Sequence, residues 1–359
     1  MNLQAFTSYS DQSSKAPLAI EQTNSASNDE PVSSRVSSPS LAALWARKYI
    51  SGLQAQDETV QSTRLRSVTE ADSQAGRATT VQHLSQNLSL ASAQAWSKTE
   101  ALLAGEIQRH QINPTLIDPW QIAADCHGLF QKCLEAYRDR VPPARLSVLM
   151  GREFGQMRQK YTTHDPRTLG FVSMQFHYTG VMLLEALSSI EQSLLTPYLK
   201  VMDDHLYMPL QVAYEAAADY EIDSPSLVAV QQLLLVSTPI AHAVCDHVCR
   251  LRPAYASYSG ELGSSQVRVS SIRDVEMFQV YLCLCVLQNS IRSVQQELFP
   301  LCVMLYPKLK VNWELVQEML RAIGWEMLDR LSSDHTAIFV RYLRALSDMF
   351  ALETFEYHR

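Results

Sequence analysis

The densest group of metal-ligand residue types lies between His242 and Cys249, in the segment HAVCDHVC. On a helix, His242, Cys245 and Cys249 fall on one face, and imidazole and thiolate groups are ligands that zinc prefers. His242 and Cys249 are about 10.5 Å apart along a helix axis, so they cannot both bind one ion. The pattern leaves two interpretations: a metal site that uses Cys245 and Cys249 with ligands from elsewhere, or buried cysteines that act as small apolar residues.

Two histidines in apolar helical surroundings could hold a cofactor. His177 lies in FVSMQFHYTG, and His205 follows Val201 by one helical turn. A histidine inside a helical bundle can ligate a haem, a linear tetrapyrrole or a metal. The competing interpretation is a hydrogen-bonded core histidine, with His177 part of a polar network that fixes helix register.

The run Asp203-Asp204-His205 contains an acid and a base, but its spacing does not favour catalysis. Asp203 and His205 lie roughly 200° apart around a helix, so they cannot act on one substrate unless the helix breaks at Pro209. Asp204 shares a helix face with Lys200, and that face is predicted to be solvated.

A short amphipathic helix is the first of two candidate partner-binding surfaces. Leu41, Trp45 and Tyr49 recur at i, i+4 and i+8, which predicts a helix that ends near Leu53. A short helix with flexible flanks commonly docks into a groove on a partner protein. The alternative is that this helix folds back onto the core of its own chain.

The second candidate surface is the segment RPAYASYSGELGSSQVRVS, which follows Leu251 and ends at Ser270. It has no helical periodicity over roughly 20 residues, and loops of that length in compact domains are often functional or disordered. Its side chains suited to a partner interface, including the arginines at its end, are Tyr255, Tyr258, Arg268 and Arg273. We expect a protein-binding surface here.

Capping signals predict where the helices begin. An acidic or hydroxyl side chain precedes proline at Asp118-Pro119, Asp165-Pro166 and Ser224-Pro225, and such a pair is typical of a helix N-terminus. Capping boxes begin at Ser188 and, in a looser form, at Ser271. We therefore expect helices to start near residues 119, 166, 189, 225 and 272, after Pro142-Pro143, and near Asn312 and Asp334. Breaks or kinks are expected at Pro197, Pro209, Pro239 and Pro300.

The fold class predicted from these elements is all-α, a multi-helix bundle-like domain. Apolar residues from Val275 to Leu287 point in every direction around a helix, so this helix must be enclosed by others. There is no credible series of strands. Residues 1–40 are predicted to be a disordered tail, 41–115 a flexible arm with one or two amphipathic helices, the second from Leu88 to Gln111, and 116–359 an all-helical globular domain.

Composition and missing motifs narrow the function. The chain has 359 residues and a net charge of −7 without a basic stripe, which argues against nucleic acid as a ligand. Seven cysteines without a secretion signal favour a reducing, cytoplasmic setting. The longest apolar run, Met277 to Leu287, is about half the length of a transmembrane helix. The sequence lacks a Walker loop, His-Glu-x-x-His, the di-iron Glu-x-x-His pair and Gly-x-Ser-x-Gly.

Three segments, FVSMQFHYTG, SSIRDVEMFQVYLC and QQELFPLCVMLYPKLKV, resemble all-helical proteins of unknown function from cyanobacteria. The resemblance covers the region from about Asp118 to Phe350 and leaves the tail out. It implies a soluble cytoplasmic protein with a role near photosynthesis or its regulation. It supplies no catalytic motif.

The leading hypothesis from the sequence is a non-catalytic interaction or regulatory protein, a helical domain that binds a protein partner with a flexible N-terminal docking arm. The alternative is a helical-bundle sensor or enzyme that holds haem, a linear tetrapyrrole or a metal through His177 or His205. A helical enzyme for a hydrophobic substrate is a third possibility, because apolar pockets need few recognisable residues. The oligomeric state, including a homo-oligomer, stays open.

Overall fold

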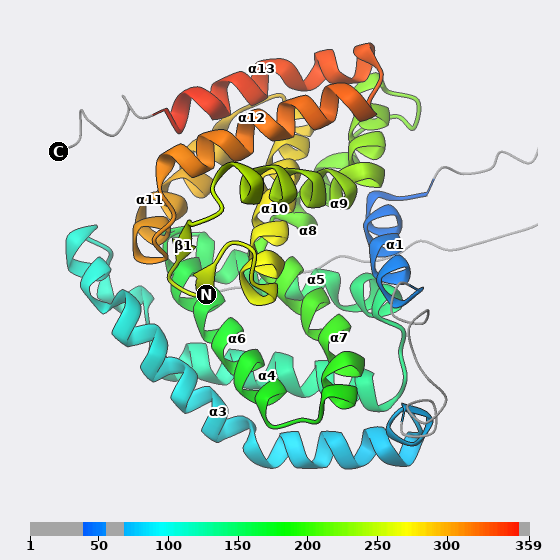
Figure 1. Ribbon diagram of the computed structural model, residues 1–359, viewed down its shortest axis with the longest axis vertical. Coiled ribbons are helices and arrows are strands. Elements are labelled where there is room, and N and C mark those ends of the chain that lie inside the picture. The colour runs from blue at the N-terminus through cyan, green and yellow to red at the C-terminus, as the bar shows by residue number, and fades with distance from the viewer. Residues whose placement is uncertain (1–38, 55–67, 352–359) are drawn as a thin grey trace, which may run out of the picture. The chain divides into compact units, whose positions relative to one another are not determined.

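The computed structural model describes residues 39–54 and 68–351. Within these ranges the chain is helical apart from one short hairpin, which confirms the all-α prediction (Figure 1). The predicted tail lies almost wholly outside the described residues. The first helices are α1 (Leu41–Gln54), α3 (Gln74–Arg109), the 3-10 turn η2 (Pro114–Leu116), α4 (Pro119–Arg138), α5 (Pro143–Thr162), α6 (Thr168–Glu185), α7 (Ser189–Tyr207) and α8 (Leu210–Ala217).

The second half of the chain is built in the same way. It contains α9 (Pro225–Leu251), the strands β1 (Ala256–Ser257) and β2 (Gly260–Glu261), α10 (Ser265–Leu287), the π-helical turn η3 (Val294–Leu298), α11 (Phe299–Lys308), α12 (Trp313–Arg330) and α13 (Ser333–Met349).

Most helix starts agree with the capping signals. The Asp118 carboxylate accepts hydrogen bonds from the first backbone N–H groups of α4, and Ser188 forms both bonds of its capping box. The exception is α10, which begins at Ser265 rather than near residue 272, because Ser264 and not Ser271 is its N-cap. A serine three residues before an acidic residue therefore predicted the wrong cap in this segment.

The start of α3 was predicted at Leu88 but lies at Gln74, where Ser73 caps the helix. The helical turns between Gln74 and the predicted start are polar in sequence and show no helical periodicity. Further along, the helix buries small residues such as Ala91, Ala95 and Thr99 against its neighbours. Small residues give little hydrophobic contrast, so the buried face of a long helix is hard to find from periodicity.

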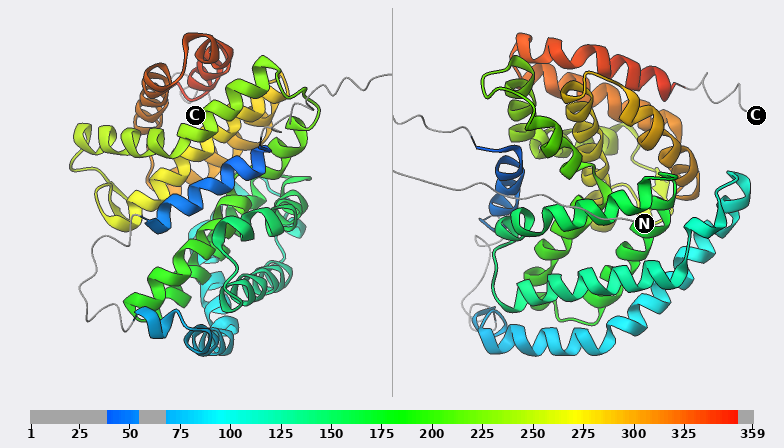
Figure 2. Two further views of the ribbon diagram at one scale, coloured as in Figure 1. Left: turned by 90° about the vertical axis from the view of Figure 1, so that its right-hand side faces the viewer. Right: turned by 180° about the vertical axis from the view of Figure 1, so that it is seen from behind.

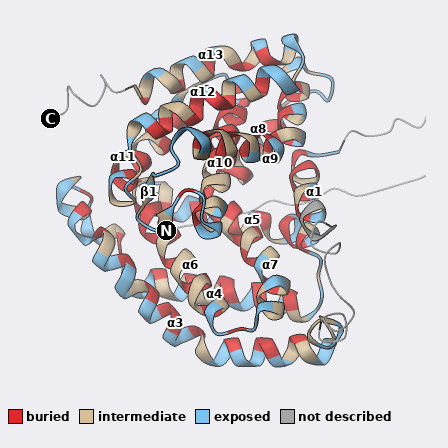
Figure 3. Cartoon of the chain, in the orientation of Figure 1, coloured by how far each residue is buried: buried red, intermediate tan, exposed pale blue. Residues whose placement is uncertain are grey.

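Two groups of helices pack against each other. α3 to α7 form one group, and α9 to α13 form the other, with α8 packed between α5 and α10. α10 is buried without interruption from Val275 to Leu287, as its all-round apolar pattern predicts (Figure 3). α1 packs against α5 and α7 of the first group and against α9 of the second (Figure 2).

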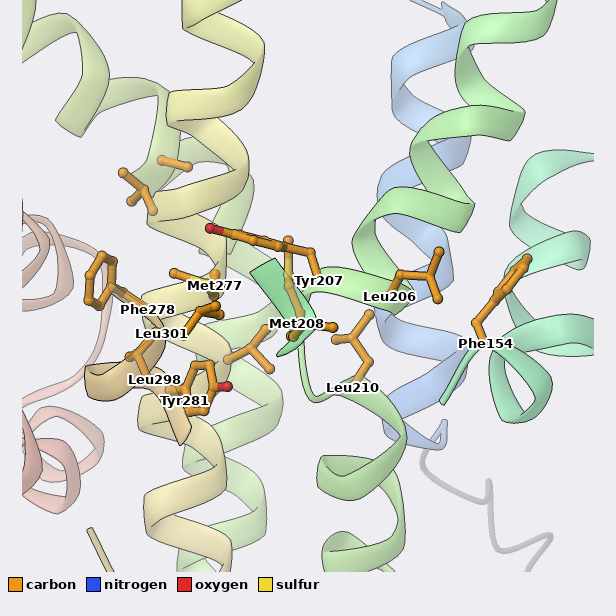
Figure 4. Close-up of a cluster of buried hydrophobic side chains, with 14 of the residues drawn as sticks. Phe154, Leu206, Tyr207, Met208, Leu210, Met277, Phe278, Tyr281, Leu298 and Leu301 are labelled. Atoms are coloured by element: carbon orange, nitrogen blue, oxygen red, sulfur yellow. The ribbon is translucent and has the colours of Figure 1, made fainter. Parts of the chain in front are cut away.

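The break between α7 and α8 lies in the core where the two groups meet (Figure 4). Pro209 lacks an N–H and ends the helical pattern, as expected. Leu206 and Leu210, on either side of the break, lie near Phe154 of α5, while Tyr281 of α10 lies on the other side of Met208. The proline therefore turns the chain inside the core rather than at its surface.

The predicted N-terminal arm differs from the structure. Leu41, Trp45 and Tyr49 are only 4%, 1% and 5% exposed. This burial agrees with the alternative interpretation, in which the helix folds back onto the core of its own chain. The described residues 39–54 and 68–351 lie in one compact unit, which continues across the boundary predicted at residue 115. Trp45 and Tyr49 are core residues here, and the docking prediction for this face is corrected accordingly.

Among the described residues, α9 is long and apolar enough to cross a membrane, with a mean hydropathy of 1.6 over the best window. Half of that window is buried in the structure, where α9 packs against α10 and α12. The core helix of a soluble protein meets the same criterion, so α9 is weak evidence for a membrane span.

Candidate functional site

The segment predicted as a long loop contains a small hairpin. β1 and β2 pair antiparallel, with Ala256 opposite Glu261 and Ser257 opposite Gly260. Gly260 has a φ of +130°, a conformation that favours glycine over residues with a Cβ. The two-residue strands are too short to be recognised from side-chain alternation, so the sequence could not reveal them.

Two tyrosines fix the hairpin to the turn between α11 and α12. The Tyr255 hydroxyl donates to the carbonyl of Lys310 at 2.5 Å and accepts from the N–H of Asn312 at 2.8 Å. The N–H of Tyr258 donates to the carbonyl of Leu309 at 2.9 Å. Tyr255 is thus an internal anchor, whereas the side chain of Tyr258 is 51% exposed.

The hairpin covers a hollow of about 90 Å³. We call it the hairpin hollow. Its walls come from the hairpin, α6, the first half of α10, the end of α11 and α12, and its polar or charged side chains include His177, Ser259, Gln266, Ser271, Arg273 and Asp274. Its apolar wall includes Met174, Leu262 and Met319. The structure therefore brings His177 of α6 and Arg273 of α10, which the sequence treated separately, to one site.

Arg273 is the charged centre of the hairpin hollow. Its Nη1 lies 2.8 Å from Asp203 and its Nη2 lies 3.4 Å from Asp274, while its guanidinium carbon is 4.1 Å from the Tyr207 ring centre. Nε is buried, and no described residue offers it an acceptor. Burial opposes the charge on Arg273, but Asp203 and Asp274 outweigh it and raise the pKa of the guanidinium. Burial raises the pKa of the Asp274 carboxyl.

His177 lies beside this centre. It is partly buried, and its ring centre is 5.4 Å from that of Tyr178. Burial, and to a smaller extent the Arg273 charge, lower the pKa of the imidazole below its ordinary value. His177 is therefore neutral at pH 7 and can either donate or accept a hydrogen bond in the hairpin hollow.

His205 does not join this site. It is 1% exposed, its Nδ1 lies 2.9 Å from the carbonyl of Val201, and its Nε2 lies 3.3 Å from the Ser147 hydroxyl. Burial lowers its pKa to about 4. Both ring nitrogens have partners, so the prediction of a cofactor ligand is corrected to the core-histidine alternative.

The proposed metal cluster does not assemble. His242 is exposed, Cys249 is partly buried, and Cys245 is buried with a thiol pKa raised to about 12 by burial. Nowhere in residues 39–54 and 68–351 do three or more metal-ligand side chains meet in a way that could hold an ion. The second interpretation, cysteine as a small apolar residue, fits Cys245.

Arg268, also predicted to bind a partner, forms an ion pair at the surface. Its Nη1 lies 2.6 Å from Asp246 of α9, and its side chain is 31% exposed. Solvent-exposed pairs of this kind contribute little stability. Arg268 thus helps to fix α10 against α9 without lining the hairpin hollow.

A group of four charges that the sequence did not reveal lies beneath α1. We call it the α1 cluster: Lys48 of α1, Lys200 and Asp204 of α7, and Glu276 of α10. Lys48 Nζ lies 2.8 Å from Glu276 and 3.2 Å from Asp204, and Lys200 Nζ lies 3.0 Å from Asp204. The carboxylate side chains of Asp204 and Glu276 are 0% exposed, so the predicted solvated face at Asp204 is wrong.

Neutral side chains complete the α1 cluster. The Tyr49 hydroxyl donates to Asp204 at 2.8 Å, the Trp45 indole N–H donates to the Tyr49 oxygen at 3.0 Å, and the Thr238 hydroxyl donates to Glu276 at 2.6 Å. Burial alone would raise the carboxyl pKa values, but Lys48 and Lys200 outweigh it and lower the pKa of both Asp204 and Glu276. Each of the four charged groups of the cluster thus has a partner of opposite charge, and both carboxylates are buried.

Comparison with known proteins does not assign this chain to a family. No protein-family model, curated protein or solved structure matches the chain.

Proposed function

We propose that this chain is a non-catalytic interaction protein that binds a partner protein at the hairpin hollow. The observation that carries the proposal is the hollow itself, which lies beneath the hairpin and is lined by hydrogen-bonding side chains such as His177, Gln266 and Arg273. A hydrogen-bonding side chain of the partner is therefore the expected occupant.

The size of the hairpin hollow supports a side chain over a free small molecule. Its volume of about 90 Å³ is well below the roughly 300–1,000 Å³ of typical ligand pockets. A few side chains anchored in well-packed pockets are how many protein interfaces gain their affinity. The predicted haem or tetrapyrrole on His177 requires a much larger opening.

Two exposed side chains lie next in sequence to residues that line the hairpin hollow. Tyr258 is 51% exposed, and Val269 on the adjoining turns of α10 is 61% exposed. Tyr and Arg are enriched at protein interfaces and dominate their binding energy. The partner segment should therefore carry one accepting side chain for the hollow and apolar residues that cover Tyr258 and Val269.

Site-specific photo-crosslinking tests this proposal. A photoreactive phenylalanine analogue in place of Tyr258 should cross-link one defined protein in cells that express the chain, and the same analogue in place of Leu90, which is 60% exposed on α3, should not. Addition of Ser271→Phe, which fills the hollow, should abolish the cross-link at Tyr258. If the Ser271→Phe variant folds and still cross-links equally, the hollow is not the binding site.

A separate measurement tests the alternative that the chain binds a haem or tetrapyrrole cofactor. A haem or tetrapyrrole on His177 would give the purified chain visible absorbance that His177→Ala removes while the fold survives. A colourless preparation from native cells counts against it.

A further inference from the structure

The exposed face of α12 carries two large apolar side chains one helical turn apart. Trp325 is 56% exposed and Leu328 is 65% exposed. Residues three apart on a helix lie on the same face. Among the side chains that the structure describes, no other two large exposed apolar residues lie three or four apart on one helix. Single exposed apolar residues are normal, whereas adjoining ones mark an interaction surface.

Opposite charges lie on either side of Trp325 on this face. Arg321 precedes Trp325 by four residues and Asp329 follows it by four, so the three side chains form one stripe along α12. The Arg321 side chain is 58% exposed, and that of Asp329 is 78% exposed. We call Arg321, Trp325, Leu328 and Asp329 the α12 patch.

Both charged groups of the α12 patch can form further bonds. Arg321 Nη1 donates to Glu318 at 2.9 Å, and the Asp329 carboxylate lies 3.8 Å from Arg330 Nη1. Exposed pairs within one helix contribute little stability. A guanidinium has five N–H groups and a carboxylate accepts several hydrogen bonds, so each can bind a second group of opposite charge.

Trp325 is oriented by α9, the neighbouring helix. The ring centre of His247 lies 5.7 Å from that of Trp325, with the two rings 82° apart, which is a favourable edge-to-face contact. Nε2 of His247 lies 3.9 Å from Glu318 of α12. A side chain that is held in place before binding loses less conformational freedom on binding. Trp325 therefore has the properties of an interface anchor, a role in which tryptophan is enriched.

We propose that the α12 patch binds the same patch of a second copy of this chain, with the two α12 helices antiparallel about a twofold axis that passes beside Trp325. In this arrangement, residues equally far before and after Trp325 lie opposite each other. Arg321 of each copy then faces Asp329 of the other copy. A twofold interface contains each contact twice, so two ion pairs enclose the two indole rings.

The charges select this arrangement over two others. A parallel pair of α12 helices would place Arg321 opposite Arg321 and Asp329 opposite Asp329, and like charges across an interface are unfavourable. An antiparallel pair whose axis passes between the two apolar residues would place Arg321 opposite Ser332, which has no charge. Antiparallel pairing about Trp325 satisfies both charges, which is why a second copy is the expected occupant.

The α12 patch is separate from the hairpin hollow. α12 lines the hollow with Leu315 and Met319, which are both buried. None of the four residues of the α12 patch lines the hollow. Self-association through this patch therefore goes beyond the proposed function and does not depend on it.

Sedimentation equilibrium of the full-length chain over a series of concentrations measures self-association directly. The mass of one chain is 40.5 kDa. We expect the average mass to rise with concentration from this value to twice this value and to rise no further, because a twofold interface closes on itself.

Two charge reversals test the antiparallel contact. Arg321→Glu and Asp329→Arg each place like charges opposite each other twice, so each variant alone should self-associate more weakly by about tenfold or more. In an equal mixture of the two variants, the introduced glutamate faces the introduced arginine and the two native residues face each other. The mixture should therefore associate as tightly as the unchanged chain. Arg152→Glu, on an exposed position of α5, is the matched control and should change nothing.

Removal of the anchor should have the largest effect. Trp325→Ser takes away the central apolar contact of both copies, so self-association should weaken more than in either charge reversal. Leu149→Ser is the control, because Leu149 is 60% exposed on α5, and it should associate as the unchanged chain does. Circular dichroism of each variant shows that the fold is kept.

Two results would overturn the proposal. One is a mass of 40.5 kDa at every concentration, which would leave the α12 patch to a different protein or to none. The other is a mixture of the two charge reversals that associates no more tightly than each folded variant alone. Neither result bears on partner binding at the hairpin hollow, because that test uses positions 258 and 271.

Discussion

The α1 cluster and the hairpin hollow are built from the same kinds of groups, but they leave those groups in different states. Each combines lysine or arginine with two carboxylates of α7 and α10: Lys48 and Lys200 with Asp204 and Glu276 in the cluster, and Arg273 with its two aspartates in the hollow. In the cluster, tyrosine and threonine hydroxyls supply further bonds to the carboxylates. In the hollow, Arg273 and Asp274 line an open space together with other hydrogen-bonding side chains.

This difference separates a group that stabilises the packing of the helices from a group that is able to bind another molecule. A closed, fully paired network specifies how helices pack, and removal of one member leaves the others buried and uncompensated. A network that lines a hollow can form hydrogen bonds to another molecule that enters it. A buried arginine or lysine therefore has a structural role where its partners satisfy all of its N–H groups, and it is available for binding where they do not.

The largest effect should follow from a change in the α1 cluster. Lys48→Met removes the cation nearest to Glu276 and keeps most of the apolar side-chain volume. It leaves the buried carboxylates Asp204 and Glu276 with Lys200 alone, so we expect a loss of about 3–5 kcal/mol in the free energy of unfolding. Urea denaturation followed by circular dichroism measures it. A loss below about 1 kcal/mol would mean that water reaches these carboxylates and that the cluster is not closed.

The pH dependence of stability should show a second effect beside the α1 cluster. Because burial lowers the pKa of His205 to about 4, against about 6.5 in an unfolded chain, the unfolded state binds the additional proton between these values. Stability should therefore be complete above pH 6.5 and fall by about 3 kcal/mol as the pH drops to 4.

Urea titrations at pH 7, 5.5 and 4 test this dependence. In His205→Gln the fall between pH 7 and 4 should be much smaller than in the unchanged chain, whatever the absolute stability of the variant. The lowered pKa values of Asp204 and Glu276 add a separate loss only below about pH 4, where carboxylates of the unfolded chain become protonated. An equal slope in both proteins would remove His205 as the cause.

Arg273→Met should have a smaller effect than Lys48→Met. The Asp203 side chain is 31% exposed and can be hydrated once Arg273 is gone, and the raised pKa of Asp274 allows this carboxyl to be neutral. We expect a loss of about 1–2 kcal/mol in the free energy of unfolding, together with loss of the cross-link from position 258. A cost equal to that of Lys48→Met would make the hairpin hollow another structural network and would contradict the comparison.

The smallest change in stability should come from exposed residues next in sequence to those that line the hollow. Tyr258→Ala and Val269→Ser replace exposed side chains, so each should change the free energy of unfolding by no more than about 0.5 kcal/mol. Both should nevertheless weaken partner binding in a competition assay against the unchanged chain. Leu90→Ser, an exposed change on α3, is the control and should alter neither quantity.

More of the fold than of the candidate site could be predicted from the sequence. Helix starts at Pro119, Ser189 and Pro225 follow from local side-chain hydrogen bonds and proline geometry, and these act within a few residues. The burial of α10 follows from its apolar residues on every side. The start of α10 itself was missed because two serines, Ser264 and Ser271, compete as N-caps, and the hairpin before the helix decides between them.

The sequence by itself determined the helical class and most helix starts, and it singled out the long connection after Leu251, because these depend on local patterns. Only the tertiary structure decided that α1 is buried, that Asp204 pairs with Lys48 of another helix, and that Arg273 and His177 share a hollow. The physical reason is that the environment of a charge depends on residues far away in the chain. The pairing of Arg158 with Glu297 likewise joins helices that no local pattern connects.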